Sequence, residues 1–159
     1  MRKDLLWRRA AREDLESIIN LLYDDPLGKN RENPQNIQAY EKAFKEISMD
    51  QNQWLMVLEK KGKVIGTCHL TVMPSLTFQG SRRLHLEAVR IDASYRGQGL
   101  GKLMIQKAMR MAQQEKCCLV ELTTSKNRSD AKAFYEGLGF EATHEGMKWS
   151  VKDFSATGI

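Results

Sequence analysis

The segment Tyr95–Lys102, with the sequence Tyr-Arg-Gly-Gln-Gly-Leu-Gly-Lys, has the residue types of an anion-binding turn. It follows a strand-like run, residues 83–91, and leads into a run with helical spacing. Glycines let backbone N–H groups approach a ligand, and a helix N-terminus adds unpaired donors and the positive end of its dipole. Arg96 and Lys102 add full positive charges. We therefore expect a phosphate-binding turn here.

The spacing of this segment excludes two common phosphate-binding patterns. A Walker A loop would need glycine where Arg96 stands and Ser or Thr where Leu103 stands. A dinucleotide-binding fingerprint would need a third glycine in place of Lys102. An ordinary glycine-rich turn without a ligand remains the alternative.

Two motifs resemble those of the GCN5-related N-acetyltransferase (GNAT) superfamily. Arg96-x-x-Gly99-x-Gly101 resembles its Arg/Gln-x-x-Gly-x-Gly/Ala signature, and Ala131–Phe140 is similar to its Ala-x-x-Phe-Tyr-x-x-x-Gly-Phe motif. Residues 86–91 look like the family's cofactor-binding strand. The motifs stand in the family's order, and the likeness is closest to small, single-domain bacterial-type members.

The resemblance implies that acetyl-CoA is the co-substrate. In the family, turn amides hold the CoA pyrophosphate, and the pantetheine arm pairs with the preceding strand where it splays from its parallel neighbour. Carried over to this sequence, the CoA contacts are Val89, Arg90, Ile91, Arg96, Gly97, Gln98, Gly99, Gly101 and Lys102. Many members have Asn seven residues before the motif tyrosine. Here Arg128 has that place with Asn127 beside it, so both are candidate CoA contacts, and Arg128 is alternatively a contact for phosphate or acceptor.

Acetyl transfer from a thioester to an amine needs a base, oxyanion donors and an acid for the thiolate. Tyr135 matches the family's acid tyrosine; the alternative is a core tyrosine. Glu87 is the first candidate base, acting through water, and His85 is the second; the alternatives are a surface or ion-paired carboxylate and a partly exposed histidine. Strand alternation puts His85, Glu87 and Val89 on one face unless a bulge intervenes. The backbone N–H of Val89 or Arg90 is the expected oxyanion donor.

The acceptor amine is not identified by the sequence. Asp24 and Asp25 could hold an ammonium group, and a solvated turn before Pro26 is the alternative. Amino acids, polyamines, aminoglycosides, aminophosphonates and protein amines all remain open.

The sequence predicts an acetyl-CoA-dependent N-acetyltransferase that moves acetyl to a primary amine by direct transfer in a ternary complex. A small-molecule amine is favoured over a protein or histone lysine. A non-catalytic acyl-CoA-binding regulatory module is the alternative from another class, and it would tolerate loss of Glu87 and Tyr135.

Composition limits the remaining possibilities. The 159 residues suit a single domain over 1–159. No apolar run approaches the ~18 residues of a membrane span, so we expect a cytoplasmic protein without a membrane partner. Three Cys and three His lack metal-ligand spacing, so no metal is expected. The net charge of +5 is dispersed, which disfavours nucleic acid as a partner. A homodimer is possible from the resemblance.

The hydrophobic periodicity predicts an alternation of strands and helices. The expected strands are 5–9, 54–59, 64–73, 83–91, 119–123 and a terminal hairpin of 140–144 and 147–151, and the expected helices include Leu15 to Leu22, Asn33-Pro34 to Ile47, Leu100 to Ala112 and Ser129 to Leu138. This order predicts an α/β (α+β) fold with a mixed, mostly antiparallel sheet, splayed parallel central strands and helices on both faces.

Overall fold

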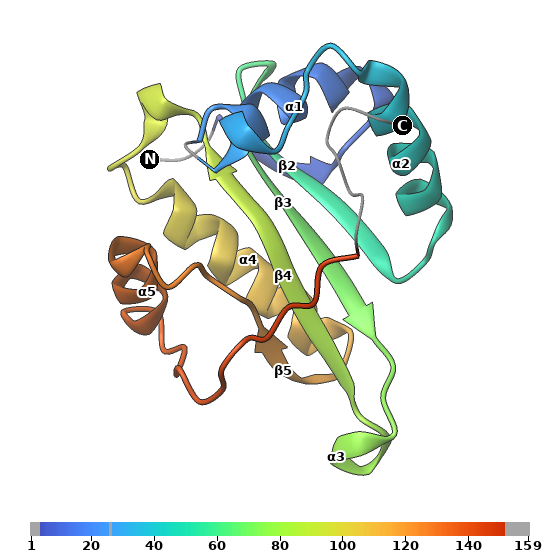
Figure 1. Cartoon of the computed structure of the whole chain (residues 1–159), viewed down its shortest axis with the longest axis vertical. Helices are drawn as coiled ribbons and strands as arrows, with labels where there is room; N and C mark the ends of the chain where they lie inside the picture. The colour runs from blue at the N-terminus through green and yellow to red at the C-terminus, as the bar shows by residue number, and fades with distance from the viewer. Residues whose placement is uncertain (1–3, 26, 152–159) are drawn as a thin grey trace.

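A five-stranded sheet in the order β1-β2-β3-β4-β5 forms the centre of the computed structural model, which describes residues 4–25 and 27–151 (Figure 1). The strands are β1 (Leu5–Arg9), β2 (Gln53–Lys60), β3 (Lys63–Met73), β4 (Arg82–Ile91) and β5 (Cys117–Glu121). Neighbouring strands are antiparallel except β4 and β5, which are parallel. The mixed, mostly antiparallel sheet expected from the sequence is confirmed.

Helices cover both faces of this sheet (Figure 1). They are α1 (Leu15–Tyr23), α2 (Ile37–Met49), the four-residue α3 (Thr77–Gly80), α4 (Leu100–Gln114) and α5 (Ser129–Glu136), with short 3-10 turns at Arg12–Asp14, Gly28–Asn30 and Ala93–Tyr95. Ile18 and Leu21 of α1 pack against Val57 and Val64 on one face. The buried side of α4 packs on the other face in the larger core cluster. Within the described residues, no helix is long and apolar enough to cross a membrane.

Strands β4 and β5 part after a short paired stretch. Their pairing runs from Arg82 opposite Cys117 to His85 opposite Glu121. β5 ends there, whereas β4 continues to Ile91. Within the described residues, the second half of β4 therefore has an unpaired backbone edge on the β5 side, which is the splay that the family resemblance implies.

A β-bulge in β4 changes which side chains share a face. The pairing of β4 with β3 shifts by one residue between Thr67–Arg90 and His69–Glu87, and Ala88 has the left-handed φ of 54°. Beyond the bulge, Val89 packs with the core on the α4 side. Alternation without a bulge placed Val89 with His85 and Glu87; the extra residue moves it to the opposite face.

One helix, α2, begins later than expected, and another, α5, begins one residue earlier than a cap at Ser129 would give. α2 begins at Ile37 and not at Asn33-Pro34, because Asn33 instead closes a separate turn. Its side chain accepts a hydrogen bond from the N–H of Gln35 at 3.1 Å, and its carbonyl accepts one from Asn36 at 3.0 Å. Ser129 is the first helical residue of α5, and Arg128 occupies the capping position.

The predicted terminal hairpin is wrong. Residues 140–151 form no strand, and Met147 and Trp149 are almost fully exposed. Alternation supplies one apolar face, but a strand also needs a neighbour's backbone. This segment instead meets the chain after β5: Lys126 lies 3.9 Å from Glu145, and a Cβ on Gly146 would lie 3.9 Å from Thr123. As a result β5, which the sequence placed inside the sheet, is its edge strand.

Candidate functional site

The turn between β4 and α4 presents backbone donors at one place. Gly97 and Gly99 adopt the left-handed φ values of 73° and 72°, which favour glycine. Gly99 occupies the position before α4, and its carbonyl accepts the N–H of Leu103 at 3.1 Å. The N–H groups of residues 100–102 precede that bond and have no partner within the helix. The turn therefore has the backbone geometry of an anion site.

Some side chains of the turn are already bonded within the protein, and others are not. The Nε of Arg96 donates to the carbonyl of Ile91 at 3.0 Å, and its guanidinium lies 3.7 Å from the Asp24 carboxylate. Arg96 thus ties the turn to the end of β4 and to the loop after α1. Gln98 donates to the carbonyl of Ser94 at 3.3 Å, and Lys102 is exposed. Backbone N–H groups and Lys102 are therefore the donors that the turn leaves for a ligand.

Helix α5 packs directly against this turn. A Cβ on Gly101 would lie 3.4 Å from Cζ of Phe134, so glycine at this position allows the close approach. The ring of Phe134 contacts that of Tyr135 edge-on at 5.1 Å, and Phe140 contacts Tyr135 from another side at 5.6 Å. These contacts fix Tyr135 beside the turn that precedes α4.

Burial raises the pKa of Tyr135 above its usual value, although the charges of Arg128 and Arg90 partly oppose this. The phenol therefore keeps its proton at neutral pH and can donate it. Tyr135 packs at the border of the core cluster on the α4 side of the sheet. Its hydroxyl is within electrostatic reach of Arg90 on β4.

Glu87 lies on the opposite face of β4 and is half-exposed. Its partner is His69, directly across on β3, whose Nδ1 lies 3.2 Å from Oε1 of Glu87. The hydrogen bond from His69 lowers the pKa of Glu87, and this outweighs the opposing effect of burial. Glu87 is therefore ionised at neutral pH and can accept a proton.

His85 shares the face of Glu87 but makes weaker contacts. Its Nε2 lies 3.9 Å from Glu87, and its Nδ1 lies 3.9 Å from Glu121 of β5. Both separations are too long for a hydrogen bond. His85 and Glu87 are thus brought together as predicted, but His69 holds Glu87 more closely.

His69 is a site residue that sequence reasoning missed. No motif includes His69, and only the β3–β4 register makes it the neighbour of Glu87. Its other ring nitrogen, Nε2, lies 2.7 Å from Oε1 of Gln53, which also accepts a hydrogen bond from Thr71 at 2.9 Å. The strand pairing, combined with alternation along β3, is the signal that could have identified it.

The acidic residues of the loop after α1 are already paired with arginines. Oδ2 of Asp25 lies 3.3 Å from Nε of Arg90 and 3.8 Å from the guanidinium of Arg128. Burial alone would raise the pKa of Asp25, but the N–H of Leu27 and the two arginines lower it overall. The suggestion that Asp24 and Asp25 hold an ammonium group therefore does not fit, because arginines already contact both.

Asn127 and Arg128 are the candidate CoA contacts that precede α5, and of these two only Arg128 lies near Asp25. Asn127 is exposed, and its backbone N–H lies 3.4 Å from Oγ of Ser125. The CoA contacts expected on β4 lie on opposite faces of the sheet. Val89 and Ile91 pack with the core, while Arg90 lies on the face of Asp25.

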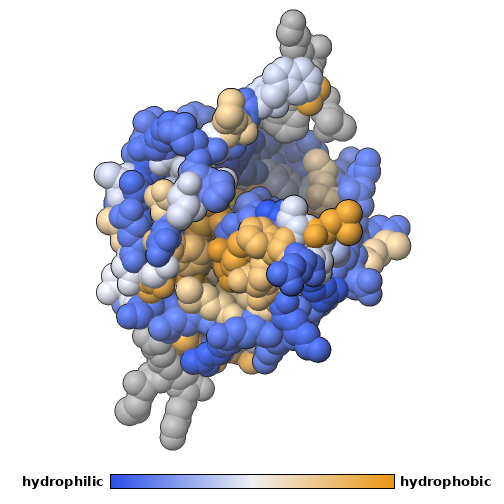
Figure 2. All heavy atoms as spheres, turned by 90° about the horizontal axis from the view of Figure 1, so that it is seen from below, coloured by the Kyte–Doolittle hydropathy of each residue, from blue (hydrophilic) through white to orange (hydrophobic). Residues whose placement is uncertain are grey.

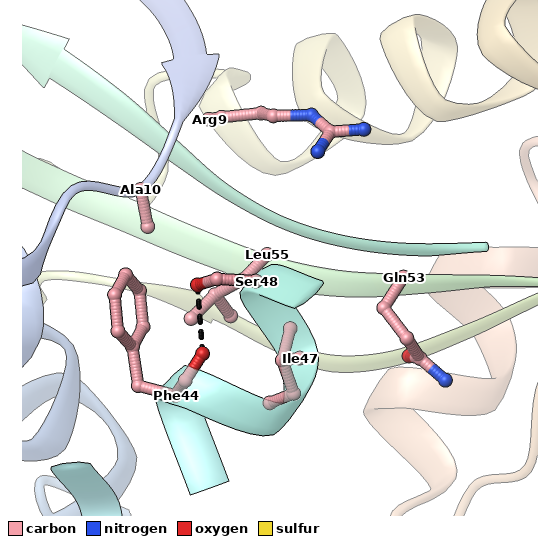
Figure 3. A pocket seen from close by; sticks show the side chains of 7 residues that line it. All are labelled: Arg9, Ala10, Phe44, Ile47, Ser48, Gln53 and Leu55. Atoms are coloured by element: carbon pink, nitrogen blue, oxygen red, sulfur yellow. Dashed lines mark hydrogen bonds between the residues drawn. The ribbon is translucent and has the colours of Figure 1, made fainter. Parts of the chain in front are cut away.

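A small cavity of about 230 Å³ lies between α2 and the start of β2 (Figure 3). Its lining residues are Arg9, Ala10, Phe44, Ile47, Ser48, Gln53 and Leu55. Gln53 is the connection to the site, because its Oε1 also contacts His69. The cavity is thus separated from Glu87 by two hydrogen-bonded side chains.

Seen from below, hydrophobic residues gather in the middle of the molecule within a border of hydrophilic ones (Figure 2). This end includes β5 and the segment that follows α5 (Figure 1).

Two of the three cysteines are poor candidates for a nucleophile, whereas Cys118 is exposed. Cys68 is buried, and burial raises the pKa of its thiol and of that of Cys117. Both thiols are therefore protonated at neutral pH and are poor nucleophiles. Within residues 4–25 and 27–151, no cluster of His, Cys, Asp and Glu has the arrangement of a metal site.

Comparison with known proteins identifies the family. The sequence model of the Acetyltransferase (GNAT) family matches residues 15–140. Glucosamine 6-phosphate N-acetyltransferase of Trypanosoma brucei brucei is 36% identical over 87 residues, which are 55% of this chain and 57% of that enzyme. The chain thus spans little more than half the length of this curated relative.

Solved structures agree with the fold. A transcriptional regulator from Bacillus halodurans C-125 has a TM-score of 0.89 and 41% identity, covering 92% of this chain and 99% of that one. An aminoglycoside N-acetyltransferase in complex with CoA has a TM-score of 0.76 and 19% identity, covering 93% and 95%, so it shows the fold alone.

Proposed function

Because the chain belongs to the Acetyltransferase (GNAT) family, we propose that it transfers an acetyl group from acetyl-CoA to a primary amine of a small molecule. The observation that carries this proposal is the set of N–H groups at the start of α4, which follows the half of β4 that is not paired with β5. Bound acetyl-CoA would supply a thioester, whose sulfur leaves as a thiolate.

The residues of the turn fit the phosphates of this donor. The N–H groups of residues 98–102 and the charge of Lys102 would hold the pyrophosphate, while Arg96 keeps the turn against β4. The unpaired edge of β4 at residues 89–91 offers backbone groups to the pantetheine arm, and the N–H of Val89 or Arg90 to the oxyanion. The left-handed Gly97 and Gly99 support this assignment, since a Cβ is unfavourable at both.

Two titratable groups would move the protons. Glu87, held ionised by His69, takes the proton of the acceptor ammonium directly or through water. Tyr135, which burial keeps protonated, gives its proton to the leaving sulfur. His85, 3.9 Å from Glu87, is a second candidate for the base. Protonated Cys68 and Cys117 support direct transfer over a covalent acyl-enzyme.

The preference for a small-molecule acceptor rests on the named activity of the trypanosomal relative, which acts on an amino sugar phosphate. The amine itself remains to be found by assay. Purified protein with acetyl-CoA would be tested against a panel of amines by following thiol release and the mass of the acetylated product. We expect turnover with at least one small amine, and Glu87→Gln should lose it by about 100-fold or more. Thiol release that no amine stimulates would refute the proposal.

A regulatory module that binds acyl-CoA without turnover is the second candidate. The observation in its favour is the 41% identity to a protein described as a transcriptional regulator. The paired Glu87 and the buried Tyr135 favour catalysis. The same assay separates the two, because a regulatory module would bind CoA in calorimetry and release no thiol.

A further inference from the structure

Two arginines near the parted strands share a single carboxylate. Arg90, directly after the bulge in β4, and Arg128, at the start of α5, both approach Oδ2 of Asp25. The side chain of Arg90 is only 12% exposed, and within the described part of the chain its Nε is a buried donor without a hydrogen bond. Two cations beside one carboxylate leave an excess positive charge; Arg90 is mostly removed from water, whereas the side chain of Arg128 is 40% exposed. Such a charge is costly unless an anion joins it.

The position of this arginine pair relates it to the reacting groups. The charges of Arg90 and Arg128 act on the hydroxyl of Tyr135, the candidate acid. The charge of Arg31, from the loop after α1, acts on both Arg90 and Glu87, the candidate base. The arginines therefore lie within electrostatic reach of the acid on one side and of the base on the other.

The donor turn supplies anion-binding groups of its own, and the loop after α1 joins it to the arginine pair, because Arg96 donates to the carbonyl of Asp24 at 3.3 Å. The turn at residues 97–102 supplies backbone N–H groups and Lys102. Asp25, in contrast, follows α1 on the face that carries Glu87 and His69. An anion bound at Arg90 and Arg128 would therefore belong to a molecule on the Glu87 side of β4, which is the side of the acceptor.

We propose that Arg90 and Arg128, with Arg31 at the rim, bind an oxyanion of the acceptor, so that the acceptor is a primary amine carrying a carboxylate or a phosphate. This inference rests on the proposed function and specifies its substrate class. A guanidinium offers paired N–H donors that match either group. Glu87 receives the ammonium while the arginines receive the oxyanion. Arg31 is 55% exposed and pairs with Glu32 at 2.8 Å, so it contributes less than the other two.

Matched pairs of amines test the inference with the wild-type protein. Each pair differs by the anion: glucosamine 6-phosphate with glucosamine, O-phosphoethanolamine with ethanolamine, and 4-aminobutyrate with butylamine. We expect kcat/KM to favour the anionic member by about tenfold or more in at least one pair. The phosphate and carboxylate pairs distinguish the two anions. Equal kcat/KM values within every pair would overturn the inference and leave the acetyltransferase proposal standing. If none of the amines is acetylated, both proposals are overturned.

A variant shows whether the arginines are responsible. Arg128→Gln should raise KM for the anionic amine about tenfold, with little change for its neutral partner or for acetyl-CoA. Arg110→Gln is the control, because Arg110 is exposed on α4, and it should change none of these values. A change confined to KM for acetyl-CoA would assign Arg128 to the donor and overturn the inference. If Arg128→Gln fails to fold, the amine pairs alone decide.

Discussion

The turn proposed to bind the donor (the donor turn) and the face of β4 proposed to bind the acceptor (the acceptor face) are built in different ways. The turn consists of consecutive residues, 96–102, whose N–H groups point together because two glycines adopt left-handed φ values. The acceptor face takes Glu87 from β4, His69 from β3 and Asp25 from a loop. The first depends on local backbone geometry, and the second on strand register and a bulge. Substitutions should therefore act on donor affinity in one region and on proton transfer or acceptor binding in the other.

The largest effect is expected at Tyr135, which lies between the two regions. Tyr135→Phe removes only the hydroxyl and keeps the edge contacts with Phe134 and Phe140. Because a positioned acid contributes about 100-fold or more, kcat should fall by that factor while CoA affinity stays nearly unchanged. Steady-state kinetics with calorimetry of CoA binding measures both. An unaltered kcat would remove Tyr135 from the chemistry.

A second prediction isolates the donor turn. Gly97→Ala places a Cβ at a φ of 73° and should raise KM for acetyl-CoA about tenfold. Gly62→Ala, in the β2–β3 hairpin, is the matched control, since its φ is 80°. Among the described residues, neither Cβ would have a neighbour within 4 Å. Both variants should lose about 1 kcal/mol of stability, but only Gly97→Ala should weaken donor binding. If Gly97→Ala and Gly62→Ala have the same KM for acetyl-CoA, the turn does not hold the donor.

The third prediction concerns the acceptor face alone. His69→Leu removes the hydrogen bond that lowers the pKa of Glu87, so that pKa should rise. If Glu87 is the base, as proposed, it acts as the carboxylate, so the acidic limb of kcat/KM should move to higher pH, with a loss of only a few-fold at neutral pH. Thr71→Val is the control, since Thr71 bonds to Gln53 within the same network. If the acidic limb of the pH profile does not move in His69→Leu, Glu87 is not the base.

The smallest effect on activity is expected remote from both regions, at Asp14. The carboxylate contacts Arg8 at 2.6 Å, and this hydrogen bond lowers its pKa despite burial. Its stabilising effect is complete above the usual carboxyl pKa and is lost as the pH falls through the lowered value. Asp14→Asn should cost about 1–2 kcal/mol at neutral pH, because Arg8 keeps its pair with Glu59, and leave kcat unchanged. Urea unfolding should show the difference from wild type narrowing in acid, and a constant difference would contradict this assignment.

The sequence predicted what depends on neighbouring residues. Glycine spacing identified the turn, and alternation identified β4 and the hairpin across Lys61-Gly62. The bulge at Ala88 was not predictable, because nothing in Ala itself favours a left-handed φ. Consequently the separation of Val89 from Glu87 was missed. His69 and the Asp25 contacts were also missed, because they depend on which strands and loops become neighbours.

The terminal hairpin shows the opposite error. Apolar and polar residues alternate in residues 140–151 as they do in strands, yet this segment forms no strand. Local pattern supplies a face, and only the tertiary arrangement supplies the neighbouring backbone.

A crystal structure of the protein with CoA tests the central claim most directly. The account predicts the pyrophosphate against the N–H groups of residues 98–102 and the sulfur at the parted end of β4, between Glu87 and Tyr135. A CoA molecule whose phosphates lie away from this turn, or whose sulfur points away from both side chains, would contradict it.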